Sequence, residues 1–323
     1  MTNTSSEVSY SPLSLTTSFK VSWYEDKCVV NSNEDEILEV KTQLKGEELF
    51  LNFIMTNSNS TDHLFLVMVE HLLGHVPSIT KITANFNNPL GRSFLRSDLY
   101  QLPLLWTKST SYQIEPERWT QTKDVKHPVR PASQEGHCYK RYVPHLEKTI
   151  SLRRTDPEKD LDQFHEWHNQ TRVAFFWELN KPKEELKEYM EKSLLDQHLI
   201  PMIVEIDGEP VGYFEMYWVR EDRLGPYYNS DAFDRGFHVL IGNKKYLGQN
   251  YTDSVLKSAL HFLFLDDPRT RRVMAEPRHD NQKILKYAEE SIGWKQLKIF
   301  DFPHKRAVLL ENSREVFFGG NAL

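Results

Sequence analysis

The chain has 323 residues, of which 39% are hydrophobic and 27% charged, and its formal net charge at pH 7 is −6. This composition is typical of a globular protein and excludes a fibrous or disordered chain, and the length favours two domains. The acidic balance argues against a general nucleic-acid partner. Because the first residues lack the pattern of a signal peptide and no apolar run approaches a membrane span, we predict a cytoplasmic protein without a membrane partner.

The N-terminal third carries the patterns of a small α/β module. Residues 28–53 alternate in short runs with a turn near Lys45-Gly46, residues 63–73 have helical spacing and stop at Gly74, and residues 79–86 form an expected strand. Residues 107–144 are polar, rich in proline and without a sustained period, which indicates a linker. We place the domain boundary near residue 140, between an N-terminal domain (1–140) and a C-terminal domain (141–323).

Stronger signals follow the boundary. Residues 148–154 alternate as a strand, and the tetrapeptide from Thr155 to Glu158 is a capping box that opens a helix. A second helix is expected from about Asn180, with Pro182 in its first turn. Both helices have an apolar face and should cover one side of a sheet.

The rest of the C-terminal half alternates between strands and helices. Asp207-Gly208 between two apolar runs, 201–206 and 210–219, predicts a tight hairpin. The remaining expected strands are 237–242, 272–276, 296–302 and 306–310. The remaining expected helices are 251–265 and 281–291, the second stopped near Gly293.

The stretch from residue 234 to residue 250 is the most chemically specific. It combines a short apolar strand that carries one titratable side chain, His238, with a basic, glycine-containing loop that opens a helix. A helix start offers unpaired N–H donors and partial positive charge, so the order suits an anionic ligand. Side chains alternate along a strand, so His238 and Leu240 should face one side and Phe237 and Val239 the other.

Two further patterns indicate neither a disulfide framework nor a metal centre. Cys28 and Cys138 are too few and too far apart for a disulfide framework, and isolated thiols suit a reducing compartment. His165 and His168 stand at His-x-x-His spacing, but the zinc-protease motif is His-Glu-x-x-His and no third ligand presents itself. We expect no metal.

From residue 148 onward the order of elements resembles the acetyl-CoA-dependent N-acyltransferases of the GNAT superfamily. Four motifs resemble its siderophore-biosynthesis branch, and the segment 100–104 resembles the N-terminal half of such enzymes. These motifs are residues 211–218, 233–238, 276–282 and 300–306. The resemblance implies an α/β fold with a mixed, mostly antiparallel central sheet flanked by helices, preceded by a smaller α/β domain. That smaller domain is either a degenerate copy of the same fold or a platform for a homo-oligomer.

The resemblance also implies the chemistry. The donor would be acetyl-CoA, the acceptor a small hydroxylamine, and the product a hydroxamate. His238 would be the general base and Glu276 its orienting partner, or a second base acting through water. Tyr287 would protonate the leaving thiolate; packing on the sheet is the alternative role for this tyrosine.

The same resemblance gives the cofactor-binding residues, although the loop keeps just two of the family's glycines. The acceptor-pocket residues are expected from their position on the hairpin and the helix connection, and plain core and rim positions are the alternative for each. The Arg269 to Arg272 run would touch the adenosine phosphate of CoA or form a solvated turn. The acceptor pocket would have aromatic walls and one carboxylate, which suits a slim aliphatic diamine. Its expected members are Trp177, Glu178, Glu215, Tyr217 and Trp218. The expected cofactor-binding residues are Val239, Leu240, Ile241, Gly242, Lys244, Lys245, Gly248, Gln249, Asn250 and Asn281.

The identity of the acceptor stays open between hydroxylysine, hydroxyornithine and a hydroxylated diamine such as N-hydroxyputrescine or N-hydroxycadaverine. One rival function is N-acylation of another amine, such as an aminoglycoside. A second rival is a non-catalytic CoA-binding interaction module that has kept the fold.

Overall fold

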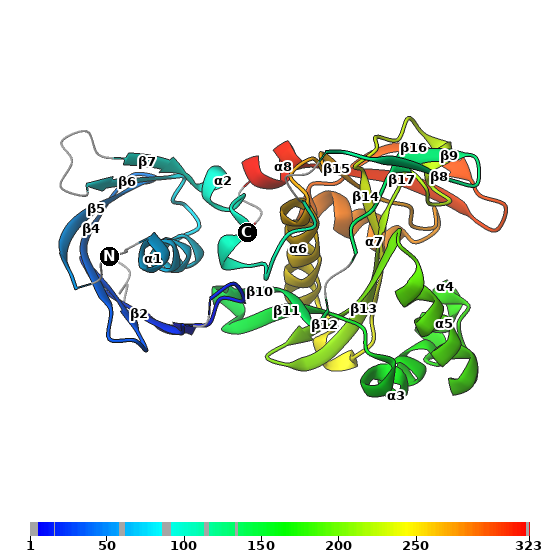
Figure 1. Ribbon diagram of the computed structural model, residues 1–323, viewed down its shortest axis with the longest axis horizontal. Coiled ribbons are helices and arrows are strands. Elements are labelled where there is room, and N and C mark those ends of the chain that lie inside the picture. The colour runs from blue at the N-terminus through cyan, green and yellow to red at the C-terminus, as the bar shows by residue number, and fades with distance from the viewer. Residues whose placement is uncertain are drawn as a thin grey trace.

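The computed structural model describes residues 6–15, 17–57, 62–85, 92–112, 116–132, 135–320 and 323, without the side chains of residues 249, 291 and 292. The chain forms two units that lie side by side, each built on its own sheet (Figure 1). One sheet has seven strands in the order β1 to β7, and the other has eight in the order β10-β11-β12-β13-β14-β15-β17-β16.

The N-terminal sheet curves around one buried helix, α1 (Figure 1). Alternating burial along its strands explains this curvature, because each strand turns one row of side chains toward α1. The expected turn at Gly46 is confirmed by a φ of 61°. The elements of this unit are β1 (Ser6–Tyr10), β2 (Phe19–Tyr24), β3 (Lys27–Ser32), β4 (Ile37–Lys45), β5 (Glu48–Thr56), α1 (Asp62–His75), β6 (Lys81–Asn85), β7 (Arg92–Leu95), α2 (Arg96–Leu99) and η1 (Pro103–Leu105). Residue 86, the last of the expected strand 79–86, lies outside the described residues.

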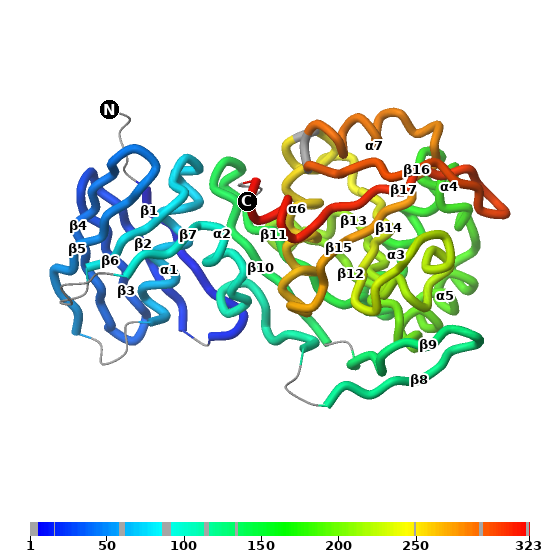
Figure 2. Tube along the Cα trace, turned by 90° about the horizontal axis from the view of Figure 1, so that it is seen from above, coloured from blue at the N-terminus to red at the C-terminus, as the bar shows by residue number. Residues whose placement is uncertain are grey.

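The expected linker is wrong in part. Residues 107–144 contain the hairpin β8 (Trp119–Thr122) and β9 (Val125–Pro128) and the strand β10 (His137–Val143). The hairpin lies along the edge of the second unit (Figure 2). β10 pairs with β11 in the second sheet, so the expected boundary near residue 140 falls inside a strand. Lys140 and Arg141 interrupt the apolar residues of β10 and concealed the strand, although Cys138, Tyr139, Arg141 and Val143 are buried.

The second unit carries the expected order of elements with additions. These elements are η2 (Pro144–Leu146), β11 (Lys148–Arg154), α3 (Pro157–His168), α4 (Thr171–Trp177), α5 (Lys183–Leu195), β12 (Leu199–Ile206), β13 (Glu209–Trp218), η3 (Gly225–Tyr227), β14 (Arg235–Ile241), η4 (Lys244–Tyr246), α6 (Gln249–Asp266), β15 (Arg272–Ala275), α7 (Gln282–Tyr287), η5 (Ala288–Ile292), β16 (Lys295–Asp301), β17 (Arg306–Ser313) and α8 (Arg314–Gly319). Helices α4 and α8 were not expected from the sequence.

Of the turn and helix-end signals in the sequence, some are confirmed and others are wrong in detail. The Asp207-Gly208 hairpin is confirmed, and both residues have the positive φ of a primed turn, 50° and 79°. The capping box is wrong in its cap, because Asp156 rather than Thr155 accepts the N–H of Glu158. The expected helix 281–291 is α-helical to Tyr287 and continues as a π-helical turn before Gly293, whose φ is 71°.

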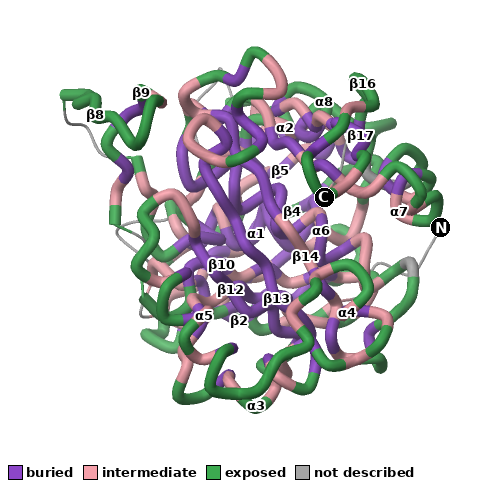
Figure 3. The backbone as a smooth tube through the Cα atoms, turned by 90° about the vertical axis from the view of Figure 1, so that its right-hand side faces the viewer, coloured by how far each residue is buried: buried purple, intermediate pink, exposed green. Residues whose placement is uncertain are grey.

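Two arrangements in the second unit position a site. β12 and β13 are buried almost throughout, as Figure 3 shows, so the middle of the sheet is a rigid platform. β14 and β15 run parallel, but their ladder contains just two pairs, Arg235↔Val273 and Gly236↔Met274. Beyond Gly236 the backbone of β14 has no strand neighbour on that side among the described residues.

The two units are joined through α6, which stands between the N-terminal unit and the second sheet (Figures 1 and 2). His261 of α6 donates from Nε2 to the carbonyl of Tyr100 at 2.7 Å and accepts at Nδ1 from the hydroxyl of Tyr139 at 2.9 Å. In the described ranges, no helix combines the length and the apolar character that crossing a membrane requires.

Candidate active site

His238 lies at the point where β14 and β15 separate. It stands directly opposite Glu215 in the β13–β14 ladder. Continuing the parallel register of Gly236 and Met274 by two residues brings Glu276, just past β15, beside His238. The imidazole Nδ1 is 3.1 Å from Glu215 Oε2, and Nε2 is 2.8 Å from Glu276 Oε1. Strand pairing alone therefore places one imidazole between two carboxylates.

Glu276 is fixed in place by more than the imidazole. Its Oε2 accepts a hydrogen bond of 2.8 Å from the hydroxyl of Tyr217, whose ring lies 4.9 Å from the ring of His238. Gly236 makes this possible, because a Cβ there would meet the Tyr217 ring at 2.4 Å. The carboxyl side chain is 1% exposed, whereas His238 is 22% exposed. The imidazole is thus the part of the pair that solvent reaches.

Glu215 is equally engaged on its other oxygen. Its Oε1 accepts from the hydroxyl of Tyr213 at 3.2 Å and from the hydroxyl of Tyr189 on α5. With His238 on Oε2, both oxygens of this buried carboxylate are occupied. Oε2 keeps a second acceptor site, but the residue is 6% exposed, so the expected role of Glu215 in the acceptor pocket stays a prediction.

The three ionisable groups shift one another's pKa values. Burial by itself would lower the pKa of His238, but the carboxylates of Glu276 and Glu215 outweigh it and raise this pKa to about 9. Burial would raise the pKa of Glu276, but His238, Lys305 and Arg223 hold it well below its usual range. The pKa of Glu215 is also lowered, because the charge and hydrogen bond of His238 outweigh its burial. At neutral pH the resting cluster is an imidazolium between two carboxylates.

Two cations border this cluster. Arg223 Nη2 lies 3.1 Å from His238 Nε2 and 3.6 Å from Glu276 Oε1, and the Arg223 side chain is 49% exposed. Lys305 donates to the backbone carbonyl of Glu276 at 2.8 Å, and its Nζ is 3.6 Å from Glu276 Oε1. The open side of the imidazole therefore faces positive charge.

The expected cofactor residues of β14 lie along the unpaired edge of that strand. The side chains of Val239 and Ile241 pack against one core cluster and that of Leu240 against another, so their backbone groups are what this edge offers. Gly242 is required by packing, since a Cβ there would meet the Trp167 ring at 2.1 Å.

The basic loop is fastened to the β12–β13 hairpin. Lys245 and Tyr246 both bind Glu209 Oε2, at 2.7 and 2.6 Å, so Lys245 is already paired. Lys244, Gly248 and Asn250 are exposed, and the side chain of Gln249 lies outside the described part of the chain. No side chain caps α6 at Gly248, which leaves the first N–H groups of an 18-residue helix facing the loop.

Asn281 and Tyr287 belong to the neighbouring helix α7. Asn281 caps this helix by accepting the N–H of Ile284 at 3.3 Å. Burial and the adjacent carboxylate of Asp253 on α6 raise the pKa of the half-buried Tyr287 above its usual value. The raised pKa keeps the hydroxyl protonated and weakens it as an acid as long as Asp253 is its partner.

The expected acceptor pocket is brought together in part. Trp177 has its ring 6.3 Å from that of His238, and Glu178 next to it is exposed at the end of α4. Trp218 is a correction, because its neighbours in the ladder place it on the opposite face of the sheet. There it stacks between Arg235 and Arg130, with guanidinium carbons 3.9 and 4.3 Å from its ring.

Three further sequence features are the arginine run from Arg269 to Arg272, the two cysteines and the His-x-x-His pair. Arg269 binds Asp267 and Arg272 binds Asp234, each through two nitrogens. Burial raises the pKa of both cysteine thiols, to about 12 for Cys28 and about 11 for Cys138. His168 is buried and donates from Nδ1 to the carbonyl of Phe164 in its own helix, and among the described residues no cluster of three metal-ligating side chains occurs.

Sequence reasoning missed four side chains of the cluster. Tyr189, Tyr213, Arg223 and Lys305 come from four different elements or loops, and all but Tyr213 reach the carboxylates or the imidazole from a distance in sequence. Alternation could have found Tyr213, which lies two residues before Glu215 on the same strand face. Nothing in the loop around Arg223 signals its position.

Comparison with known proteins identifies the family of this chain. The acetyltransferase (GNAT) domain model matches residues 156–302. The chain is 38% identical over 224 residues to the N(6)-hydroxylysine O-acetyltransferase of Escherichia coli, covering 69% of this chain and 70% of that protein. It is 38% identical over 208 residues to the N(5)-hydroxyornithine:cis-anhydromevalonyl coenzyme A-N(5)-transacylase of Beauveria bassiana, covering 63% of this chain and 45% of that protein. The chain spans about half the length of several fungal relatives.

A solved structure supports the fold. An uncharacterized protein from Bacillus halodurans matches with a TM-score of 0.55 and 28% identity, over 59% of this chain and 98% of that one. The splayed sheet and these matches together define an acyltransferase enzyme. The chain belongs to the GNAT acetyltransferase family.

Proposed function

We propose that this enzyme transfers an acetyl group from acetyl-CoA to the nitrogen of an N-hydroxylated amino acid, forming a hydroxamate for siderophore assembly. The observation that carries the proposal is His238 between Glu215 and Glu276 at the mouth of the splayed sheet. The names of the relatives, hydroxylysine and hydroxyornithine acyltransferases, supply the acceptor class.

The donor site would be the gap between β14 and β15. The unpaired backbone of residues 237–241 can hydrogen-bond amide groups of an extended thioester arm, and the uncapped start of α6 can bind a pyrophosphate. Exposed Lys244 adds positive charge near that helix start. When bound, the thioester supplies an activated acyl carbon.

His238 would act on the acceptor. The acceptor nitrogen bonds to the acyl carbon, the carbon–sulfur bond breaks, and the nitrogen's proton passes to neutral His238. Glu215 and Glu276 orient the ring and stabilise the imidazolium that forms. A hydroxylamine is far less basic than a lysine amine, whose ordinary pKa is about 10.4, so the acceptor reaches the site already unprotonated. Tyr287 is the proposed donor of a proton to the leaving thiolate.

The charges around the imidazole favour an acceptor that carries a carboxylate. Glu215 is 6% exposed, the Glu276 side chain is 1% exposed, and both already bind His238, so neither presents an open carboxylate to the free ammonium of a diamine. Arg223 is half-exposed beside His238 Nε2 and can bind a carboxylate. A hydroxylated lysine or ornithine therefore fits better than N-hydroxycadaverine or N-hydroxyputrescine.

The test is product formation with purified full-length chain, acetyl-CoA and N6-hydroxylysine. Thiol release measures turnover, and the coloured ferric complex of the product distinguishes a hydroxamate from an O-acyl ester, which does not chelate iron in that way. We expect a hydroxamate, and a loss of roughly 10²–10⁴ in kcat for His238→Ala, the range for a positioned general base.

A matched control is His165→Ala, a half-buried histidine on α3 that has no place in the cluster, which should keep full activity. Turnover with aminoglycosides but not with hydroxylated amines would refute the acceptor class. Thiol release that is unchanged in both His238→Ala and Glu276→Gln would refute the assignment of the site, and no acyl transfer at all would favour the binding-module alternative.

A further inference from the structure

A cavity lies between the two units, and none of the residues that line it belongs to the His238 cluster. Its volume is 190 Å³, well above the roughly 10–15 Å³ that one water needs. The N-terminal unit contributes Tyr10 of β1 and Glu70 of α1, and the second unit contributes Arg141 of β10 and Ser254 of α6. The cavity therefore exists because the N-terminal unit closes over α6.

The cationic wall of this cavity is Arg141. The residue is 7% exposed, and its Nη2 donates to Ser258 Oγ at 3.2 Å. Its Nε atom is buried without a hydrogen-bond partner, and no carboxylate of the described residues lies within ion-pair distance of its guanidinium. A buried guanidinium without an anion is costly, so this side chain is prepared for a negatively charged ligand group.

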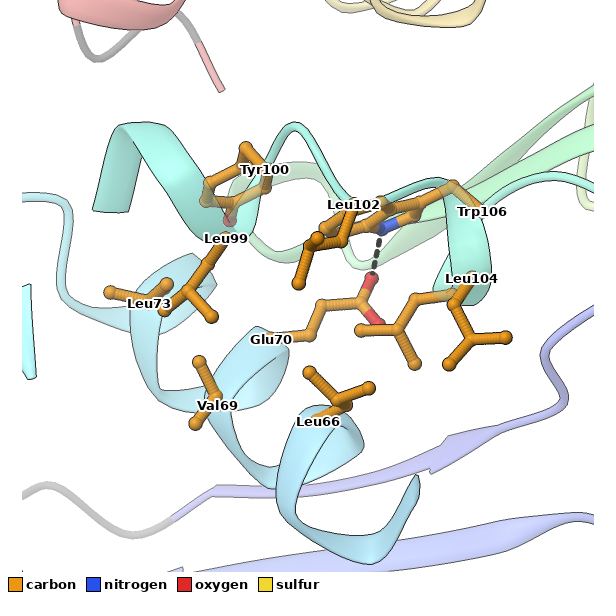
Figure 4. Close-up of a pocket in the computed structure, with 10 residues that line it drawn as sticks. Leu66, Val69, Glu70, Leu73, Leu99, Tyr100, Leu102, Leu104 and Trp106 are labelled. Atoms are coloured by element: carbon orange, nitrogen blue, oxygen red, sulfur yellow. Dashed lines mark hydrogen bonds between the residues drawn. The ribbon is translucent and has the colours of Figure 1, made fainter. Parts of the chain in front are cut away.

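The acidic wall is Glu70, which is 8% exposed. One of its oxygens accepts the indole N–H of Trp106 at 2.8 Å, as Figure 4 shows from the side of a small neighbouring pocket. Burial raises the pKa of Glu70 to about 7, although the Trp106 hydrogen bond and the charge of Arg141 oppose this rise. The charge of Arg141 therefore influences the pKa of Glu70, although no ion pair between the two side chains occurs in the described structure.

Several other polar groups of the wall have protein partners, but Asp253 Oδ1 is buried without one. Lys257 pairs with Asp253 at 2.8 Å, and the hydroxyl of Ser254 is 3.2 Å from His145 Nε2. The hydroxyl of Tyr10 bonds to His71 at 3.0 Å. Leu323, which also lines the cavity, has its oxygen bound by Arg96. The groups with unused hydrogen-bonding capacity are therefore the guanidinium of Arg141 on one side and the carboxylates of Glu70 and Asp253 on the other, and Asp253 already pairs with Lys257.

We propose that this cavity binds a small zwitterion of the α-amino acid class, its carboxylate on Arg141 and its ammonium on Glu70. The N-terminal unit then has a direct role, because it supplies the carboxylate half of the site. A ligand with a single charge would leave one of the two buried groups uncompensated and should bind more weakly.

The test uses the purified full-length chain without acyl donor. Each standard L-amino acid is screened at millimolar concentration by thermal shift, with acetate and methylamine as single-charge probes, and the best responder is titrated by calorimetry. We expect saturable binding of at least one amino acid, tighter than that of acetate or methylamine. Saturable binding of none of them would overturn the proposal.

Three variants locate the ligand. Arg141→Met and Glu70→Gln should each weaken the binding by about tenfold or more, the effect of losing a charge-assisted hydrogen bond. His238→Ala should leave the affinity unchanged. Binding that is unchanged in both Arg141→Met and Glu70→Gln, or that is lost in His238→Ala, would contradict the site. Neither result bears on acyl transfer.

Discussion

At the scale of single residues, His238 is defined by the two carboxylates that it joins. Glu215 and Glu276 raise its pKa to about 9, so the neutral imidazole that can accept a proton is the minor form near neutrality. Such a base operates increasingly well as the pH rises through this pKa. Carboxylates at both ring nitrogens and a shifted pKa are features common at functional sites, which supports the role proposed for the cluster.

This pair of carboxylates gives a pH prediction. In the wild type, kcat/KM should rise with pH and level off above about 9, because only the neutral imidazole is active. Glu215→Gln removes one charge that favours the imidazolium, so the rising limb should move to lower pH by roughly one unit. The measurement is kcat/KM against pH for both proteins.

The matched control is Glu205→Gln, another buried carboxylate of the same sheet, which binds Arg153 instead of the histidine. The rising limb of the kcat/KM profile against pH should be the same for Glu205→Gln and the wild type. An unshifted limb in Glu215→Gln would mean that His238 is not the group that titrates.

Arg223 gives a prediction about acceptor choice. Arg223→Gln should raise KM for N6-hydroxylysine by about tenfold, because a charge-assisted hydrogen bond to the carboxylate is lost. KM for N-hydroxycadaverine, which has no carboxylate, should change little. Steady-state kinetics with the two acceptors checks this, and exposed Arg92→Gln on β7 is the control. An equal rise with both acceptors would argue that Arg223 serves the catalytic pair and not the acceptor.

At the scale of elements, the pairing of β14 with its neighbours determines where the site lies. The strand is held by β13 along its full length and by β15 at two residues, so a paired strand turns into a free edge at His238. At the far end Gly242 is pressed against Trp167 of α3, and its carbonyl accepts from Gln170 and Arg172 at 3.1 and 2.8 Å. The loop that follows is therefore anchored before it turns into α6.

The contact between Gly242 and Trp167 can be tested directly. Gly242→Ala should destabilise the protein by about 1–3 kcal/mol, because a methyl group cannot fit against a rigid ring in a packed core. Thermal or urea unfolding measures this. Gly319→Ala in α8 is the control, since a Cβ there meets nothing within 4 Å and alanine favours a helix. Equal stability of Gly242→Ala and wild type would show that the ring moves freely.

At the scale of the whole molecule, the two sheets repeat one topology. In each, five antiparallel strands are followed by a crossover helix, a parallel strand and an antiparallel one: β1 to β5, α1, β6 and β7, then β10 to β14, α6, β15 and β17. We infer that the N-terminal unit is a degenerate copy of the acyltransferase fold. It lacks the helices that follow the second strand of the catalytic unit, and it has no counterpart of His238.

The junction of the two units gives a prediction about acid stability. Burial lowers the pKa of His261 to about 3, so the folded protein keeps it neutral whereas the unfolded chain takes up a proton near pH 6.5. The unfolded state binds more protons below that pH, so the free energy of unfolding falls on acidification. His261→Gln should lose about 2 kcal/mol less than the wild type between pH 7 and pH 5. Urea titrations at both pH values test this, and parallel losses would contradict it.

The sequence by itself determined most of the catalytic unit's elements and the residues at its chemical centre. Asp-Gly between apolar runs predicts a hairpin wherever it occurs, and His238 was conspicuous as the one titratable side chain on an apolar strand. Short or interrupted elements were not predicted: α4 exposes Phe175 and Phe176 and so lacks an amphipathic pattern, and charged residues interrupt β10.

Tertiary structure alone decided which side chains meet. Residues 38 apart, His238 and Glu276, lie side by side because of strand register, and the tyrosines and cations that hold them come from separate elements. It also moved Trp218 to the other face and committed Glu215 to the histidine. Local propensity acts over a few residues, whereas a binding site is a set of distances between distant ones, and only the packed sheet sets those distances.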